Sequence, residues 1–162
     1  MTRIDAAISL EEAMQFAWLE GDLLDSADYD AWLALWTPTS RYVVPIEPGA
    51  TDFENTLNYA YDDGMMRAKR VDRLTSGQSV SASPVPRTVR LLSRFRVLRS
   101  DAEGCELRCA QLLTEFRRER ERSYAADIEF LFVRTADGLR IERKVIRLIN
   151  ATAALGGIGY IL

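Results

Sequence analysis

Four segments in the second half of the chain alternate apolar and polar residues, and this pattern constrains the fold more than any other feature of the sequence. The segments span residues 88–100, 105–116, 123–134 and 139–150. Turn-type sequences at 101–104 and 135–138 and a charged crossing at 117–122 separate them. A period of two is typical of strands that bury one face, and short turns join antiparallel neighbours. The sequence therefore predicts a meander of four long antiparallel strands.

At the start of the chain the apolar residues recur at helical spacing instead. The sequence SLEE at Ser9–Glu12 has the form of a capping box and precedes an apolar stripe, so a helix is expected to begin there. Asp28 can cap a second, shorter helix that ends at Thr37–Pro38. The apolar residues of this second helix recur at helical spacing and are Tyr29, Trp32, Leu33 and Trp36.

A short strand and a third helix are expected before the meander. The strand covers residues 41–48, where Pro45 lacks an amide donor and confines it to a sheet edge or a strand end. Residues 59–77 follow as a helix for which Gly77 is the predicted stop. The residues expected on its inward side are Met65, Ala68, Val71 and Leu74.

Helices that precede a run of strands are typical of an α+β domain, and a strongly curved sheet with helices across its concave side buries both sets of apolar faces. A chain of 162 residues is expected to form one domain, residues 1–162. Its composition is globular, with 48% hydrophobic and 28% charged residues. No apolar run approaches the roughly 20 residues of a membrane span, and the first residues lack a secretory layout, so we expect a cytoplasmic protein.

The residues that are missing exclude several functions. The sequence contains no histidine, which excludes a Ser-His-Asp triad and a metal site built on imidazole nitrogen. Cys105 and Cys109 would lie roughly 13 Å apart on a strand, too far to form a disulfide or share one metal ion. The net charge of -3 lacks the basic excess of a nucleic-acid binder. We therefore expect no catalytic or metal site built on histidine, no metal site on the two cysteines and no nucleic-acid surface.

The charged residues of segment 59–77 have three interpretations. The preferred one is a stabilised helix with a solvated basic end, the second is a subunit contact, and the third is a catalytic cluster. Acids early and bases late suit the helix dipole, but the bases exceed what the dipole requires, and arginine is enriched at interfaces. The charged residues in question are Asp62, Asp63, Arg67, Lys69, Arg70 and Arg73.

Two other stretches are candidate contacts. Arg90, Arg94 and Arg96 are expected on one face of the strand 88–100, which is either solvated or bound to a partner. The opposite face is expected to bury Val89, Leu91, Phe95 and Val97. The nearly uncharged tail, which includes Tyr160 and Leu162, is expected to lie in a groove of its own domain or of a neighbouring subunit.

Four stretches, taken in their order and spacing, resemble the beta (small) subunit of bacterial aromatic-ring-hydroxylating dioxygenases, the Rieske non-haem iron oxygenases. They are EGDLLDSADYDAWLALWTPTSRYVVP, YDDGMMRAKRVDRLTSG, SPVPRTVRLLSRFRV and LRIERKVIRLIN. The resemblance covers nearly the whole chain. It implies the nuclear-transport-factor-2-like cone, in which a strongly curved mixed sheet packs on three helices.

The resemblance also implies a function and partners. The beta subunit is expected to be a non-catalytic structural subunit that assembles with a larger alpha subunit. The Rieske [2Fe-2S] cluster and the mononuclear non-haem iron are expected in that alpha subunit, with no cofactor in this chain. Three copies of each subunit are expected to assemble, and a reductase, often with a ferredoxin, supplies electrons. Membrane association is not expected.

Two other classes of function remain open. A stand-alone cone-fold enzyme, such as a dehydratase or isomerase, could use an inward-facing Asp127 or Glu129 with Tyr42 or Tyr124. The other alternative is a small-ligand binding module without chemistry. An open pocket with a buried, unpaired carboxylate would favour the enzyme, whereas a cone filled by aromatic side chains would favour the subunit.

Overall fold

The computed structural model describes residues 1–4, 6–76, 86–151 and 160–162. Helices and strands alternate in these ranges before a final run of four strands, which confirms the expected α+β class. In chain order the elements are α1 (Leu10–Asp25), α2 (Tyr29–Leu33), β1 (Trp36–Pro45), the 3-10 helix η1 (Phe53–Asn55), β2 (Asn58–Asp62), α3 (Gly64–Thr75), β3 (Arg87–Asp101), β4 (Gly104–Arg117), β5 (Arg120–Thr135) and β6 (Gly138–Leu148).

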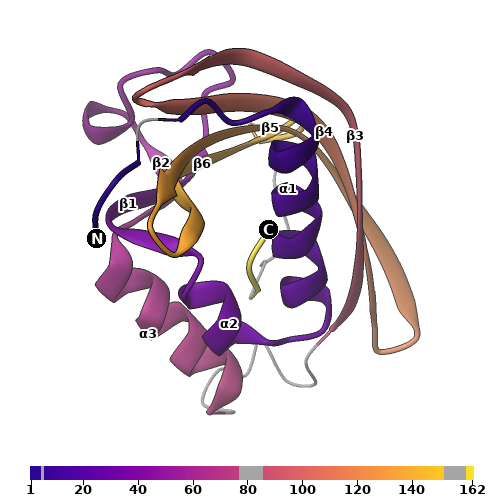
Figure 1. Ribbon diagram of the computed structural model, residues 1–162. Coiled ribbons are helices and arrows are strands. Elements are labelled where there is room, and N and C mark those ends of the chain that lie inside the picture. The colour runs from indigo at the N-terminus through magenta and orange to yellow at the C-terminus, as the bar shows by residue number, and fades with distance from the viewer. Residues whose placement is uncertain (5, 77–85, 152–159) are drawn as a thin grey trace.

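The strands form one sheet in the order β2-β1-β6-β5-β4-β3. Strands β3 to β6 pair antiparallel with their neighbours in sequence, so the predicted meander is confirmed. β1 pairs antiparallel with β2 but parallel with β6, which makes the sheet mixed. Figure 1 shows the sheet curving around α1, with the C-terminal residues on the same inner side.

The core lies between α1 and the inner face of the sheet. The predicted capping box is present, since the Ser9 hydroxyl accepts from the Glu12 amide at 3.2 Å and the Glu12 carboxylate accepts from the Ser9 amide at 2.9 Å. The buried stripe of α1 packs on the sheet, with the Phe16 and Phe132 rings 4.9 Å apart in an edge-to-face contact. Strands β4 and β5 alternate around this core, as Leu107, Leu113 and Ile128 show.

The second predicted helix is wrong at its C-terminal end. α2 ends at Leu33, and Trp36 opens β1, so the strand begins five residues before the expected position. The cause is pairing with the far end of the chain: the Ile141 amide donates to the Leu35 carbonyl at 2.8 Å, and Trp36 pairs with Ile141 in register. Pro45 is the last residue of β1, as one of the two expectations allowed.

The third predicted helix begins later than expected, because residues 58–62 form strand β2 beside β1. Asp63 is the N-cap of α3, and its carboxylate accepts from the Met66 amide at 2.9 Å. Val71 and Leu74 are buried as predicted, but Met65 and Ala68 are exposed and Arg67 is buried in their place. The predicted stop, Gly77, lies outside the described residues.

The connections of the meander are tight. β4 and β5 remain paired as far as Arg117 and Arg120, so the charged segment is a hairpin rather than a loose crossing. Its two turn residues, Arg118 and Glu119, have positive φ, as the tightest hairpin turns require.

Gly104, at φ +145°, leaves no space for a side chain, because a Cβ atom there would meet the Phe132 carbonyl oxygen at 2.5 Å. In the described ranges no helix is long and apolar enough to cross a membrane.

Candidate functional site

The interior of the cone contains a buried acid–base pair. Lys144, on the inner face of β6, places its Nζ atom 2.9 Å and 3.1 Å from the two carboxylate oxygens of Glu20 on α1. The indole Nε1 of Trp32 donates to the same Glu20 carboxylate at 2.9 Å. Burial lowers the pKa of the Lys144 amine, and the Glu20 carboxylate opposes that shift. The interior carboxylate is therefore paired with a cation and a donor.

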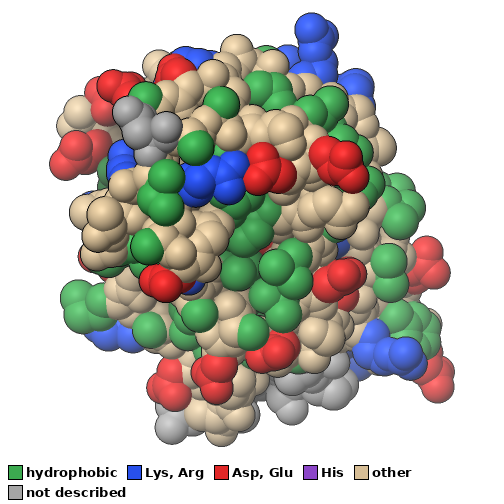
Figure 2. Space-filling view, viewed as in Figure 1, with side chains coloured by type: hydrophobic (Ala, Val, Ile, Leu, Met, Phe, Trp, Pro, Cys, Tyr) green, Lys and Arg blue, Asp and Glu red, His purple; other side chains and the backbone are tan. Residues whose placement is uncertain are grey.

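Residues 160–162, at the end of the tail, also lie in the interior. Ile161 and Leu162 are buried, and so is the side chain of Tyr160 beside Tyr124. The Leu162 amide donates to the Tyr42 hydroxyl at 2.9 Å, and Lys144 donates to the Leu162 carbonyl at 3.0 Å. In the space-filling view, atoms close the region that looks open between the ribbons (Figure 2). Of the two expected positions for the tail, the structure shows the groove of its own domain for residues 160–162.

Asp127 and Glu129 do not face the interior, so the inward orientation that the enzyme hypothesis required is wrong. They alternate on β5 with Tyr124, Ile128 and the other buried residues, and a period of two places them on the outer face. Asp127 forms an ion pair with Arg108 at 2.5 Å, and Glu129 with Arg147 at 2.8 Å.

The orientation of Asp127 and Glu129 also separates them from the two tyrosines named as their partners. Tyr42 and Tyr124 are buried on the inner side. Burial raises the pKa of the Tyr42 hydroxyl to about 12. A carboxylate on one side of the sheet and a tyrosine on the other cannot share a pocket, so neither predicted acid–base set exists.

The basic residues of α3 divide into two groups. The side chain of Arg67 is buried, and its guanidinium lies 4.2 Å from the Trp36 ring centroid and donates to the Ser40 hydroxyl at 2.5 Å. Burial lowers the pKa of Arg67 to about 10. Arg70 donates to the buried carboxylate of Asp62 at 2.7 Å. These two arginines therefore tie α3 to β1 and β2.

The second group, Lys69 and Arg73, is exposed. The expected solvated basic end of the helix is therefore found only at Lys69 and Arg73. Asp62 departs from it as well, because this acid lies at the end of β2 rather than in the first turn of a helix.

The three arginines of β3 do not share a face, which corrects a second expectation. A bulge at Arg94, whose φ is +56°, interrupts the pairing with β4 between Ser93 and Arg96. Before the bulge, Arg90 and Leu92 face the core; after it, Phe95 and Val97 do. Val89 and Leu91 are exposed as a result, contrary to the single alternation expected for this strand.

Arg90 is consequently an internal residue. Its guanidinium binds the Asp25 carboxylate at the end of α1 and the Ile161 carbonyl oxygen of the tail. Arg94 and Arg96 are exposed.

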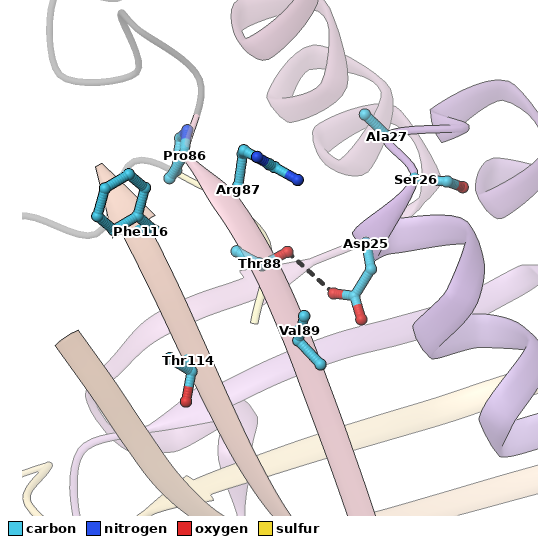
Figure 3. Close-up of a pocket in the computed structure, with 9 residues that line it drawn as sticks. All are labelled: Asp25, Ser26, Ala27, Pro86, Arg87, Thr88, Val89, Thr114 and Phe116. Atoms are coloured by element: carbon cyan, nitrogen blue, oxygen red, sulfur yellow. Dashed lines mark hydrogen bonds between the residues drawn. The ribbon is translucent and has the colours of Figure 1, made fainter. Parts of the chain in front are cut away.

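A groove of about 500 Å³ lies where the end of α1 meets the start of β3 and the end of β4. Asp25 lines the groove, and its carboxylate accepts a hydrogen bond from the Thr88 hydroxyl at 2.9 Å (Figure 3). Pro86, Val89 and Phe116 supply its apolar wall. The sequence patterns did not indicate this groove, because its residues come from three separate elements.

The side chains that the structure describes do not fit an iron–sulfur cluster or a mononuclear iron. Among the described residues no three His, Cys, Asp or Glu side chains gather closely enough to hold a metal ion. Burial raises the pKa of the Cys105 thiol, and it raises that of Cys109 to about 12. Both sulfurs are protonated near neutral pH and are poor metal ligands.

A mixed sheet curved around a helix, with residues 160–162 buried on its inner side, defines a cone-fold protein. The chain belongs to the ring hydroxylating beta subunit family, whose model matches residues 19–154. The small oxygenase component of the p-cumate 2,3-dioxygenase system of Pseudomonas putida is 28% identical over 141 residues, which cover 86% of this chain and 78% of that protein.

Solved structures confirm the fold. The beta subunit of benzoate 1,2-dioxygenase from Burkholderia mallei superposes with a TM-score of 0.77 at 22% identity, covering 96% of this chain and 99% of that one. A nuclear-transport-factor-2-like protein with a cystatin-like fold from Novosphingobium aromaticivorans has a TM-score of 0.61 at 20% identity, over 89% and 84% of the two chains. The expected cone fold is therefore confirmed.

Proposed function

We propose that this chain is the non-catalytic structural subunit of the terminal oxygenase of an aromatic-ring-hydroxylating dioxygenase. In this function it assembles with an iron-containing alpha subunit and stabilises it for O2-dependent hydroxylation of aromatic compounds. The single observation that carries the proposal, within the family, is the paired interior carboxylate. Lys144 binds the buried carboxylate of Glu20, and it also binds the carbonyl oxygen of Leu162, which is buried beside them.

The proposed assembly contains three copies of each subunit, and this chain self-associates as a trimer of single-domain protomers. The alpha subunit holds the Rieske [2Fe-2S] cluster and the mononuclear iron, and it receives electrons from a reductase, often through a ferredoxin. The complex is cytoplasmic. Family membership supports this proposal, as does the absence in this sequence of the histidines that both iron centres require.

The exposed arginines are the proposed polar contacts with alpha. Arg73, Arg94 and Arg96 reach solvent and are free to bind carboxylates of another chain. Arg67, Arg90, Tyr160 and Leu162 bind within the chain, so we propose that they support the contact surface from beneath. Arg70 is partly exposed and contributes to both.

The test is to purify the chain alone and after co-expression with the alpha subunit encoded beside it, with light scattering and an oxygenase assay on each preparation. A homotrimer that joins alpha in an active, iron-containing complex supports the proposal. A chain that does not bind alpha and turns over a small molecule unaided would overturn it.

A further inference from the structure

The hairpin that joins β4 to β5 extends past the neighbouring strand β6. β4 and β5 remain paired as far as Arg117 and Arg120, whereas the pairing of β5 with β6 ends at Ala126. Figure 1 shows this hairpin in orange, projecting beyond α1. The inner face of the two strands therefore continues outside the core that α1 and the sheet enclose.

Along this hairpin the inner face changes from apolar to charged. Leu113 on β4 pairs with Tyr124 on β5, and both side chains are buried. Residues two apart on a strand share a face, so the next two pairs on that face also lie on the inner side. These pairs are Glu115 with Arg122 and Arg117 with Arg120. The core side of the two strands therefore ends in a charged surface.

The other acids of the segment lie elsewhere. Glu121 pairs with Phe116 and belongs to the outer face, and Glu119 is in the turn. A pocket of about 490 Å³ lies at the hairpin. In the described part of the chain it is lined by Glu115, Arg117, Arg118, Arg120 and Arg122, the five residues that define the arginine pocket. Among these residues, four guanidinium groups accompany one carboxylate.

The carboxylate of Glu115 lacks one of its hydrogen-bond donors. Its side chain is 1% exposed, and its Oε1 atom accepts from Nε of Arg122. The second oxygen, Oε2, is also buried, and it has no donor among the described residues. A buried carboxylate oxygen without a donor is unfavourable. The arginine pocket therefore requires a group that donates a hydrogen bond to Glu115.

The arginines of the pocket require the opposite kind of group. Arg117 and Arg120 occupy directly opposed positions, and like charges in such positions are destabilising. The described ranges supply no second carboxylate to the wall of the pocket. The pocket is reached from solvent, because Arg118, Arg120 and Arg122 are exposed. Guanidinium groups bind oxyanions through parallel N–H donors, so the arginines favour a bound oxyanion.

We propose that the arginine pocket binds inorganic hydrogen phosphate. Its charged oxygens accept from the arginines, and its single proton is donated to Oε2 of Glu115. Sulfate has a similar shape and charge but carries no proton near neutral pH, so it leaves Oε2 without a donor. A phosphate monoester, whose second pKa is about 6, has also lost this proton at about pH 8. The inference does not rest on the proposed function.

The first experiment is a calorimetric titration of the full-length chain with inorganic phosphate, sulfate or phenyl phosphate, at about pH 8 and constant ionic strength. Phosphate is expected to bind at one site per chain, at least about tenfold more tightly than either of the others, because one hydrogen bond to a charged group supplies that difference. Equal affinity for phosphate and sulfate overturns the inference, as does the absence of phosphate binding. Tighter binding of phenyl phosphate also overturns it, because the ligand would then be a monoester.

A matched pair of variants locates the site. Arg120→Gln removes one exposed cation of the pocket and is expected to weaken phosphate binding at least about tenfold. The control, Arg73→Gln, removes the same charge from an exposed position of α3, which packs on β1 and β2 at the other end of the sheet. It is expected to leave the affinity within about twofold. Equal losses would show attraction to net charge alone and overturn the assignment to the pocket.

A third variant examines the acceptor. Glu115→Gln has nearly the same shape, but its amide can donate to an oxygen that carries no proton. Phosphate and sulfate are therefore expected to bind this variant with affinities within about twofold of each other. A folded variant, shown by unchanged circular dichroism, that keeps the full preference for phosphate overturns the assignment to Glu115. If the variant does not fold, the three anions on the unsubstituted chain and the Arg120 pair of variants decide the question.

Discussion

The Nζ atom of Lys144 lies 2.9 Å from Oε1 of Glu20, and neither side chain reaches solvent. A buried ion pair of this kind contributes little net stability when it is compared with apolar residues of the same size. Substitution of only one of the two residues is costly, because the charge that remains has neither an ionic partner nor water around it. The pair therefore makes the closed interior depend on both residues at once.

The first prediction concerns this pair. Lys144→Met is expected to lower the free energy of unfolding by about 3–5 kcal/mol, because Glu20 is left charged and buried. Adding Glu20→Leu is expected to restore part of the loss, although the Trp32 indole then lacks its acceptor. Urea unfolding of both variants measures the difference. A double variant no more stable than the single one would show that the two residues act independently.

The second prediction compares two arginines of β3. Arg90→Ala is expected to lower the free energy of unfolding by about 2–4 kcal/mol, because it removes the cation paired with Asp25 and the side-chain donor to the Ile161 carbonyl. Arg96→Ala, after the bulge and exposed, is expected to change it by at most about 0.5 kcal/mol. Urea unfolding under one set of conditions ranks them, and equal costs would contradict the reversal of faces at Arg94.

A third prediction concerns alkaline pH. Burial raises the pKa of the Cys109 thiol from 9.0 to about 12, so the folded chain keeps its proton when the unfolded chain has lost it. This contribution to stability is complete below pH 9.0 and falls as pH rises toward about 12. Unfolding free energies measured between pH 8 and 10.5 are expected to fall less steeply for Cys109→Ala than for the unsubstituted chain. If the unfolding free energies of the two chains fell in parallel with pH, Cys109 would be excluded as a cause of the loss of stability at alkaline pH.

The fourth prediction concerns two glycines in turns of the meander. Gly104→Ala combines a positive φ with a Cβ position 2.5 Å from the Phe132 carbonyl oxygen, so we expect a loss of about 3 kcal/mol or more. Gly138→Ala has only the strained φ of +107°, since its nearest neighbour is 3.8 Å away, and we expect about 1–2 kcal/mol. Thermal unfolding of the two variants provides the comparison, which similar losses would contradict.

Local patterns predicted the features that depend on neighbouring residues. The capping box at Ser9 and the alternation along β5 need nothing beyond their own segments. Trp36 fits a helix equally well by spacing, and only Ile141, about a hundred residues later, places it in a strand. Tertiary pairing of this kind overrides local preference and is invisible to periodicity.

The interior pair could have been predicted and was missed. Glu20 stands at helical spacing on the apolar stripe of α1, between Ala17 and Leu24, and Lys144 alternates with Ile146 on the buried face of β6. One acidic and one basic residue, each on a face predicted to be buried, indicate that the two form an ion pair in the core. The exposure of Val89 and Leu91 was missed for a different reason: the bulge at Arg94 places them on the opposite face of the sheet from Phe95 and Val97.

The parallel pairing of β1 with β6 has a consequence for synthesis on the ribosome. Tyr42 pairs with Lys144, so the edge of β1 that faces away from β2 remains without its neighbour until about a hundred further residues have been translated. At roughly 5–20 residues per second this takes about 5–20 s. During that interval the apolar residues Val43 and Val44 are open to the surrounding medium and to chaperones, and the sheet closes only when the final strand emerges.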